Sequence, residues 1–338
     1  LAPRRCRCLP GGPPAPPAKG ADCLMGGPLV SVVMSVYNGQ QYLRPSLDSV
    51  LAQEGVDFEF VVVDDGSTDQ SPKMLEEYAQ KDSRIRLIRQ GNTGLTRALA
   101  RGCSEARGEL IARQDADDVS FPGRLAKLAT VLQEDSGIAV AASWVEWIGP
   151  RDEPLCITRF SDVASRATEG VLHHRQSPCH GSVMFRRKDY ETVGGYRPQF
   201  YFAQDSDLWF RLSDRGGFLF VPEVLYRFRV AEGSISTSHR ESQLRLYELA
   251  RGCWSARQNV ESEEPLLAKA AQIRPGMARV GRTKKGAGAY FIGRTLLRKG
   301  DPRAAKYLWS YVQHSPWDPR GWFSVLQATL RAKMGGEE

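Results

Sequence analysis

The sequence predicts an α/β protein in which a mostly parallel sheet is flanked by helices, with a helical appendage at the C-terminal end. Three apolar runs of strand length, at residues 29–35, 58–63 and 109–114, are each followed by a helix-like pattern. A repeated strand–loop–helix unit is typical of a parallel sheet covered by helices. With 338 residues, 41% of them apolar and 25% charged, the chain can bury one large core and a small appendage.

Residues 1–28 are expected to lie outside this fold. They are rich in Pro, Gly and Ala, and they show no regular period. Such a composition has little to bury, which favours a disordered or spurious tail. Its apolar stretch is too short and too interrupted by proline for a secretory signal, and the chain begins with Leu, so Met25 is a candidate start of translation.

The first two predicted strands end in polar residues. Ser35, Tyr37 and Asn38 follow the first strand, and the segment Asp-Asp-Gly-Ser-Thr-Asp at 64–69 follows the second. Ligands of open parallel sheets bind at the carboxyl ends of the strands, so these residues are candidates for a binding site. The alternative is structural: Tyr37 would pack on the adjacent helix, and the acids would cap the helix that follows them.

The third predicted strand ends in three carboxylates, Asp115, Asp117 and Asp118, within four residues. Ionised carboxylates this close repel one another, and a divalent cation or ribose hydroxyls would make their proximity favourable. Hard oxygen ligands suit Mg²⁺ or Mn²⁺. The alternative is a solvated acidic turn, or a cap for a helix that begins near residues 121–125.

A second acidic segment opens a predicted helix at 204–212, where apolar residues recur at helical spacing. Asp205 would stand at the N-terminus of this helix, and the helix dipole there would hold the carboxylate ionised. Asp207 is its near rival.

Together these segments resemble the inverting family 2 nucleotide-sugar glycosyltransferases, which have the GT-A fold. The resemblance covers roughly residues 29–240, and the ordered set of motifs is far more specific than any single one. The motifs stand at 35–38, 63–69, 91–95 (a glycine-rich turn), 115–118 (DxD-like), 180–187, 194–196 and 204–211.

This resemblance implies a GT-A nucleotide-diphospho-sugar transferase fold. It also implies the transfer of one sugar from a nucleotide sugar, chiefly a UDP-sugar, to a hydroxyl of a glycan or lipid-linked glycan of the cell envelope or an exopolysaccharide. A metal would offset the charge that builds on the departing diphosphate, so Mn²⁺ or Mg²⁺ is the expected cofactor. Asp117 is the expected metal ligand. The implied donor-binding residues are Ser35, Tyr37, Asp64, Asp65, Arg97, Asp115 and Asp117.

Asp205 stands where the resemblance places the catalytic base, which takes a proton from the acceptor hydroxyl. The family often has Glu before this Asp, whereas this chain has Gln204. Many relatives have a histidine near the end of the domain, where this chain has Arg229, which could clamp a diphosphate but cannot ligate a metal. The residues expected on the acceptor or diphosphate side are His180, Gln204, Asp207 and Arg229.

The predicted domain at 29–240 divides into a nucleotide-binding half, 29–120, and an acceptor and catalytic half, 121–240. Within the second half, the loop 157–178, with His173, His174 and Arg175, is expected to shape acceptor choice.

The C-terminal region, 241–338, is basic and predicted to be helical. It contains seventeen Lys or Arg against nine Asp or Glu, and helical patterns run over 287–297, 303–312 and 322–330. Basic helices that carry Trp309, Trp317 and Trp322 could rest on an anionic membrane, or they could pack these tryptophans on the main domain. No recognisable nucleic-acid motif accompanies the charge, so nucleic acid is not an expected partner.

Features that the sequence lacks bear on where the protein is located. No apolar run approaches the roughly 18–20 residues that a membrane-spanning helix needs, and the seven cysteines show no metal-site spacing. These features favour a cytoplasmic enzyme, either free or peripheral on the inner face of the membrane. An inactive nucleotide-sugar-binding scaffold and a sugar nucleotidyltransferase stay open as alternatives.

Overall fold

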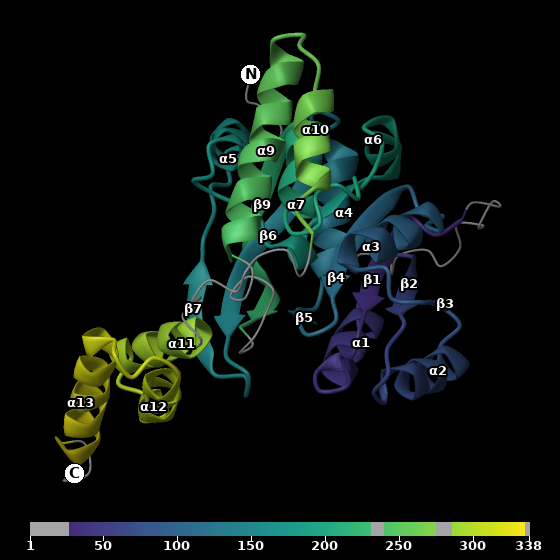
Figure 1. Cartoon of the computed structure of the whole chain (residues 1–338). Helices are drawn as coiled ribbons and strands as arrows, with labels where there is room; N and C mark the ends of the chain where they lie inside the picture. Colours follow the sequence, from purple (N-terminus) through teal and green to yellow (C-terminus); the bar gives the residue numbers. More distant parts are fainter. Residues whose placement is uncertain (1–26, 231–239, 275–285, 335–338) are drawn as a thin grey trace, which may run out of the picture.

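The computed structural model describes residues 27–230, 240–274 and 286–334. A nine-stranded sheet forms the centre of the molecule, with the strand order β3-β2-β1-β4-β8-β6-β9-β5 and β7 paired to β6 (Figure 1). The expected tail, including Met25, lies almost entirely outside the described residues, so its predicted disorder stays a prediction.

The first half of the sheet is parallel, as the sequence predicts. Its strands are β1 (Val30–Val36), β2 (Phe58–Asp65), β3 (Ile85–Gln90) and β4 (Leu110–Asp115), and β1 pairs with β2 on one side and β4 on the other. The helices that connect them are α1 (Leu43–Leu51), α2 (Ser71–Lys81) and α3 (Leu95–Ser104).

The central strands are apolar because both of their faces are covered. Val32 and its neighbours on one face belong to the core that contains Leu47 of α1, whereas Val33 on the other face belongs to the core that contains Leu99 of α3. Burial of each such side chain stabilises the fold by roughly 1.5–3 kcal/mol. The continuous apolar runs, rather than alternating ones, are the signature of this two-sided cover.

The second half of the sheet is mixed. Strand β8 (Met184–Arg186) is antiparallel to both β4 and β6, whereas β6 (Ile138–Ile148) and β9 (Gly217–Arg229) are parallel to each other. The remaining strands are β5 (Val119–Ser120) and β7 (Pro154–Thr158), and the helices are α4 (Arg124–Glu134), α5 (Ala164–Leu172), α6 (Arg187–Thr192) and α7 (Gln204–Leu212).

The C-terminal helices form two groups that lie apart in Figure 1. Helices α9 (Arg240–Gln258) and α10 (Glu264–Ala271) share a core with α7, which includes Phe210 and Leu246. Helices α11 (Ala287–Arg298), α12 (Ala304–His314) and α13 (Pro319–Met334) share another core, which Leu155 of β7 joins. The three helices predicted at 287–297, 303–312 and 322–330 are confirmed, with ends that differ by a few residues.

Within the described parts of the chain, none of the helices combines the length and apolarity needed to cross a bilayer.

Candidate functional site

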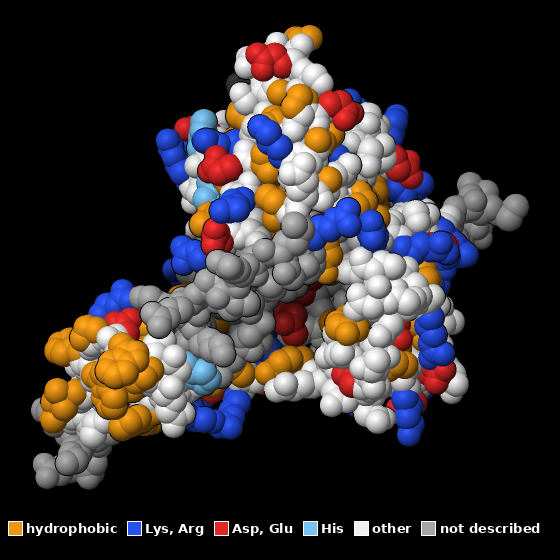
Figure 2. Space-filling view, in the orientation of Figure 1, with side chains coloured by type: hydrophobic (Ala, Val, Ile, Leu, Met, Phe, Trp, Pro, Cys, Tyr) orange, Lys and Arg blue, Asp and Glu red, His pale blue; other side chains and the backbone are white. Residues whose placement is uncertain are grey.

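The ends of three parallel strands bring the first candidate residues together. Ser35 of β1 is in register with Asp115 of β4, and its neighbour Val36 is in register with Asp64 of β2. Strand β1 is also where the strand order reverses direction, and open α/β sheets bind ligands in the crevice at such a switch point. Figure 2 shows acidic side chains within a hollow near the middle of this face, over the position of β5 in Figure 1.

Asp64 and Asp65 are both buried and bonded to nearby backbone. Asp65 accepts the N–H groups of Thr93 at 2.9 Å and Gly94 at 2.8 Å, and Asp64 accepts the N–H of Ser67 at 3.0 Å. Asp65 therefore holds the glycine-rich turn against the end of β2, where Gly94 has a φ of +89°. The capping role considered as the structural alternative accounts for these contacts. Any role of Asp64 and Asp65 in donor binding would be in addition to them.

Tyr37 and Arg97 are open to solvent. Tyr37 is 53% exposed, which leaves its ring free of the helix packing considered as an alternative. Arg97 is exposed in the first turn of α3. Both side chains are therefore accessible to a ligand at this edge of the sheet.

The three acids after β4 differ in their surroundings. Asp115 forms an ion pair with Arg113, at 2.7 Å, and its N–H donates to the Tyr226 hydroxyl at 3.2 Å. Asp117 is partly buried, and burial followed by the charge of Asp115 raises its pKa to about 6. Asp118 is fully buried: its Oδ1 accepts the N–H of Arg229 at 2.8 Å, while its Oδ2 has no hydrogen-bond partner among the described residues.

Asp118 carries the strongest electrostatic penalty of the three. Burial, followed by the charges of Asp117 and Asp115, raises the pKa of Asp118 well above its usual range. This loop therefore concentrates negative charge in a region with little water, as a site for a cation would.

The expectation that Arg229 clamps a diphosphate stays a prediction, because the guanidinium binds other protein groups in this structure. Its guanidinium is buried, donates to the carbonyl groups of Asp117 at 2.8 Å and Gly149 at 3.2 Å, and pairs with Asp152 at 2.8 Å. It also stacks on the Tyr42 ring, 4.3 Å from the centroid. Because its guanidinium already binds these groups, Arg229 fixes the position of the acidic loop.

Asp205 lies at the N-terminal end of α7 and is only partly buried. Among the described residues, the partner of its carboxylate is its neighbour Ser206, whose N–H donates at 2.7 Å. Burial is the largest cause of a raised pKa for Asp205, and the charge of Asp115 adds to it. The N–H groups of the helix terminus lower the pKa of Asp205 and act against burial, so the expectation that the terminus holds this carboxylate ionised stays a prediction.

Gln204 and Asp207 are not placed as expected for groups facing an acceptor. Gln204 is buried, and its Oε1 has no hydrogen-bond partner within the described chain. Asp207 is 1% exposed and accepts from Arg211 at 2.6 Å and from Arg197 at 3.1 Å. Because Arg197 also pairs with Glu263 at 2.6 Å, Asp207 joins α7 to the helices behind it, and its part as a rival base stays a prediction.

Arg113 and Tyr196, which the sequence analysis did not single out, form a cluster with His180 next to these acids. Arg113 has no exposed surface, although it lies inside β4, and its Nε is 3.5 Å from His180 Nε2. His180 Nε2 is also 2.7 Å from the Tyr196 hydroxyl, and Asp205 contributes to raising the pKa of Tyr196. Arg113 therefore connects the acids of β4 with the neighbourhood of Asp205. A charged residue within an apolar strand pattern was the signal that could have found it.

His180 belongs to this cluster as a neutral side chain. Burial, followed by the charge of Arg113, lowers the pKa of His180 well below its usual range. Its ring also packs edge-on against Trp209 and Tyr196. These contacts fix the position of His180 beside the acids. A direct contact of His180 with an acceptor or a diphosphate stays a hypothesis.

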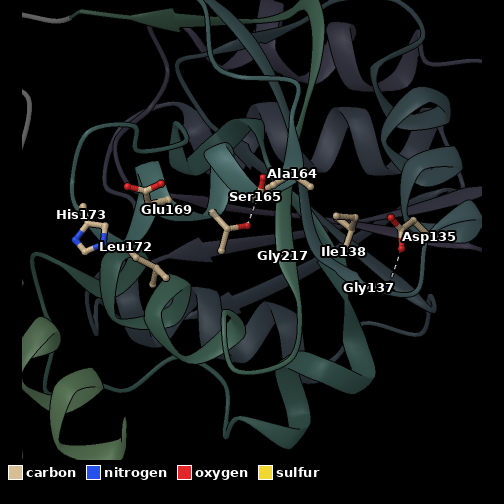
Figure 3. A pocket seen from close by; sticks show the side chains of 10 residues that line it. Asp135, Gly137, Ile138, Ala164, Ser165, Glu169, Leu172, His173 and Gly217 are labelled. Carbon is tan, nitrogen blue, oxygen red and sulfur yellow. Dashed lines mark hydrogen bonds between the residues drawn. The ribbon is translucent and has the colours of Figure 1, made fainter.

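The pocket shown in Figure 3 lies away from the acids. It has a volume of about 520 Å³ and is lined by residues such as Gly137, Gly217 and His173. Gly137 and Gly217 stand at the starts of β6 and β9, whereas Arg229 and the acidic loop stand at the end of β9. His173 therefore lies at the opposite edge of the sheet from the acidic loop, and His174 packs on Tyr247; the expected part of these residues in acceptor choice stays a prediction.

Comparison with known proteins identifies the family. A family model described as "Glycosyl transferase family 2" matches residues 31–194. The Bacillus subtilis (strain 168) protein named "Putative glycosyltransferase EpsE" is 34% identical over 212 residues, which cover 60% of this chain and 73% of that protein. This chain belongs to glycosyltransferase family 2. The B. subtilis protein named "Putative glycosyltransferase EpsH" is 36% identical over 240 residues, 66% of this chain and 68% of its own length.

Solved structures confirm the GT-A fold of this glycosyltransferase. Staphylococcus aureus TarS 1–349 in complex with UDP has a TM-score of 0.54 and 16% identity, over 89% of this chain and 88% of TarS. The mannosyltransferase PcManGT from Pyrobaculum calidifontis, in complex with GDP-Man and Mn²⁺, has a TM-score of 0.52 and 17% identity, over 93% and 89% of the two chains. At this identity the likeness shows the fold, and the family shows an enzyme that transfers sugars.

Proposed function

We propose that this glycosyltransferase is inverting and metal-dependent, and that it moves one sugar from a UDP-sugar to a hydroxyl of a glycan of the cell envelope or an exopolysaccharide. The observation that carries this proposal is the pairing of two sites. Asp117 belongs to the acidic cluster that follows β4. Asp205 lies on the separate helix α7, close enough to Asp115 for the charge of Asp115 to raise the pKa of Asp205.

Asp205 is the proposed catalytic base. An acceptor hydroxyl must lose its proton as its oxygen attacks the anomeric carbon, and a carboxylate with a raised pKa takes that proton more readily than an ordinary one. Asp205 has no arginine or lysine partner among the described residues, in contrast to Asp207. Attack from the face opposite the departing diphosphate would invert the anomeric configuration.

The acidic loop fits a divalent cation that a diphosphate helps to hold. In the described chain no three His, Cys, Asp or Glu side chains converge into a protein-only metal site. The unpaired Oδ2 of buried Asp118 and the raised pKa values of Asp117 and Asp118 nevertheless mark an excess of negative charge. Mg²⁺ and related ions are often held by one or two carboxylates plus substrate phosphates. We assign Asp117 as the ligand to Mn²⁺ or Mg²⁺, which would offset the charge of the leaving diphosphate.

The proposed donor site lies along the ends of β1, β2 and β4. Exposed Tyr37 would stack on the nucleobase, and Asp115 would reach the ribose or the sugar. Ser35 and Arg97 would complete this site, and Asp64 and Asp65 would act through the turn that they hold. We propose UDP as the nucleotide, as in the TarS complexes with UDP and UDP-GlcNAc; GDP, as in the PcManGT complex with GDP-Man, is its direct alternative.

We also propose a division of labour along the chain. Residues 29–240 would form the catalytic domain, with a nucleotide-binding half at 29–120 and an acceptor half at 121–240. The basic region 241–338 would bring the enzyme to the inner face of a membrane that carries lipid-linked glycan acceptors. This partner is supported by the excess of Lys and Arg in that region.

Thermal unfolding with nucleotides tests the donor site. A ligand that binds only the folded state raises the apparent stability, so we expect UDP with Mn²⁺ to raise the melting temperature more than UDP or Mn²⁺ alone. GDP, CDP and TDP serve as matched competitors. Stabilisation by GDP in place of UDP would reassign the nucleotide, and no stabilisation by any of the four would contradict the donor site.

A further inference from the structure

Helix α13 is packed with its small side chains inward and its large apolar side chains outward. The residues on its packed face are Gly321, Ser324, Val325 and Ala328. The side chains on its outer face, each between 46% and 60% exposed, are those of Trp322, Phe323, Leu326 and Leu330. An amphipathic helix in a water-soluble bundle has the reverse arrangement, so the outer face of α13 is suited to burial elsewhere.

Two further tryptophans extend this surface beyond α13. Trp309 of α12 is half exposed and packs edge-on against Trp322, with ring centroids 5.8 Å apart. Trp317, in the connection between the two helices, is 93% exposed. We name these six residues the α13 face: Trp309, Trp317, Trp322, Phe323, Leu326 and Leu330. Figure 2 shows hydrophobic side chains gathered over this end of the molecule.

Arginines border the α13 face. Leu330 also lines a pocket of about 350 Å³ together with Arg294, Arg298 and Arg331. None of these three arginines has an acidic partner within the described chain. Between residues 287 and 331 there are seven Lys or Arg and two Asp, and both aspartates pair with arginines, Asp301 with Arg303 and Asp318 with Arg320. The surroundings of the apolar surface are therefore strongly positive.

We infer that the α13 face inserts into the headgroup region of an anionic lipid surface, and that the arginine-lined pocket receives a lipid phosphate. Tryptophan prefers the boundary between headgroups and acyl chains, and an apolar helix face bordered by basic residues binds anionic membranes in this way. A second copy of the chain is a poorer occupant, because it would bring two positively charged borders together.

This inference rests on the membrane partner proposed above and not on the sugar transfer. Vesicle binding needs neither donor nor metal, so its failure would leave the nucleotide-induced stabilisation untouched. Conversely, a protein that binds vesicles but no nucleotide would contradict the proposed function alone.

Sedimentation with lipid vesicles tests the inference on the full chain. We expect binding to phosphatidylcholine vesicles that contain about 30 mol% phosphatidylglycerol, which makes their surface strongly anionic. Binding to vesicles of phosphatidylcholine alone should be at least about tenfold weaker. The double variant Phe323→Glu, Leu326→Glu should lose at least about tenfold in affinity for the anionic vesicles, since each change removes apolar contact and adds repulsion. The matched control is Leu244→Glu, which alters a half-exposed leucine on α9.

Arg298→Ala tests the phosphate pocket separately. It should weaken binding to the anionic vesicles by about fivefold, in line with about 1 kcal/mol for each basic residue near such a surface. Equal binding to both kinds of vesicle would overturn the phosphate assignment. No binding by the unaltered protein, or the same loss in Leu244→Glu, would overturn the membrane assignment. A dimer in solution that Phe323→Glu, Leu326→Glu converts to a monomer would assign the face to a second copy instead.

Discussion

Arg113 shows how much the candidate site depends on single buried charges. Its guanidinium bonds the Val33 carbonyl, pairs with Asp115 at 2.7 Å and lies 3.5 Å from His180. One cation thus pairs with an acid of the proposed donor site and, in addition to burial, lowers the pKa of the neighbouring imidazole. Asp205 and Asp207 show that neighbours in sequence can differ in environment. These two carboxylates stand two residues apart, yet their surroundings differ, and hence we assign them different roles.

These two aspartates give a paired prediction. Asp205→Asn should lower the turnover of sugar transfer by about 100-fold to 10,000-fold and leave stability nearly unchanged, because it removes a base with no ion-pair partner. Asp207→Asn should cost about 3 kcal/mol of unfolding free energy, because it leaves buried Arg211 and partly buried Arg197 poorly paired. Transfer assays and urea unfolding check the pair.

The Asp205→Asn result also separates the enzyme from an inactive scaffold. The enzyme would keep the UDP-induced rise in melting temperature while losing transfer. If transfer by Asp205→Asn equalled that of the unaltered protein, the assignment of the base would be withdrawn.

His180 predicts a dependence of stability on pH. Its pKa is depressed in the folded state, so below about pH 6.5 the unfolded chain takes up a proton that the folded chain does not. Stability is therefore lost as the pH falls below about 6.5, by at most about 1.4 kcal/mol for each pH unit from this group. Urea unfolding at pH 7.5, 6.0 and 5.0 should show a smaller loss for His180→Gln. The control is exposed His173→Gln, which should follow the unaltered protein.

At the scale of elements, the acidic loop is held by segments that come from distant parts of the chain. Strand β5 pairs with β9. Arg229 of β9 donates to the carbonyl of Asp117 and to the carboxylate of Asp118, and the hydroxyl of Tyr226 accepts the N–H of Asp115. On the other side, the short 3-10 helix His180–Ser182 approaches so closely that it requires a glycine at position 181. The loop is therefore positioned by packing from both sides.

Gly181→Ala tests this close approach. A Cβ at position 181 would collide with the Tyr226 hydroxyl and lie 2.9 Å from Asp115 Oδ2. We expect a loss of about 1–3 kcal/mol in unfolding free energy, with weaker Mn²⁺-dependent UDP binding. The control is Gly91→Ala, where an added Cβ meets no atom within 4 Å, and its stability should change little. Equal stability of the two variants would contradict the close packing.

At the scale of the whole molecule, the C-terminal bundle α11–α13 is fastened to the catalytic part by a few specific contacts. Leu155 and Val230 enter its apolar core, and the hydroxyl of Tyr307 on α12 donates to buried Glu153 at 2.6 Å. The bond, together with other groups, holds the pKa of Glu153 below its usual range. The α13 face lies on this bundle, so these contacts would determine how the proposed membrane surface and the acidic site are oriented toward each other.

Tyr307→Phe should loosen this connection without altering the site. Loss of the buried hydrogen bond should lower the unfolding free energy by about 1–3 kcal/mol, while the UDP-induced change in melting temperature stays the same. Differential scanning calorimetry with and without UDP and Mn²⁺ checks both parts. A weakened response to UDP would show that the bundle contributes to the donor site.

The amino-acid sequence by itself determined the parallel half of the sheet, the places of the acids at strand ends, and the helices of the C-terminal bundle. These are local features: continuous apolar runs, turn residues and helical spacing are all read within about 10–15 residues. The family resemblance, drawn from the order of such motifs, is confirmed by the relatives.

Only the tertiary structure decided which charged groups are free and which are used for packing. Arg229 meets Asp117 and Asp118 across more than a hundred residues, and Arg113 meets His180 across 67. Asp205 and Asp207 differ because only Asp207 faces Arg197 and Arg211. The outward direction of the large side chains on α13 likewise depends on which face the other helices cover. Burial and ion pairing are properties of neighbours in space, and the local pattern of a sequence does not contain them.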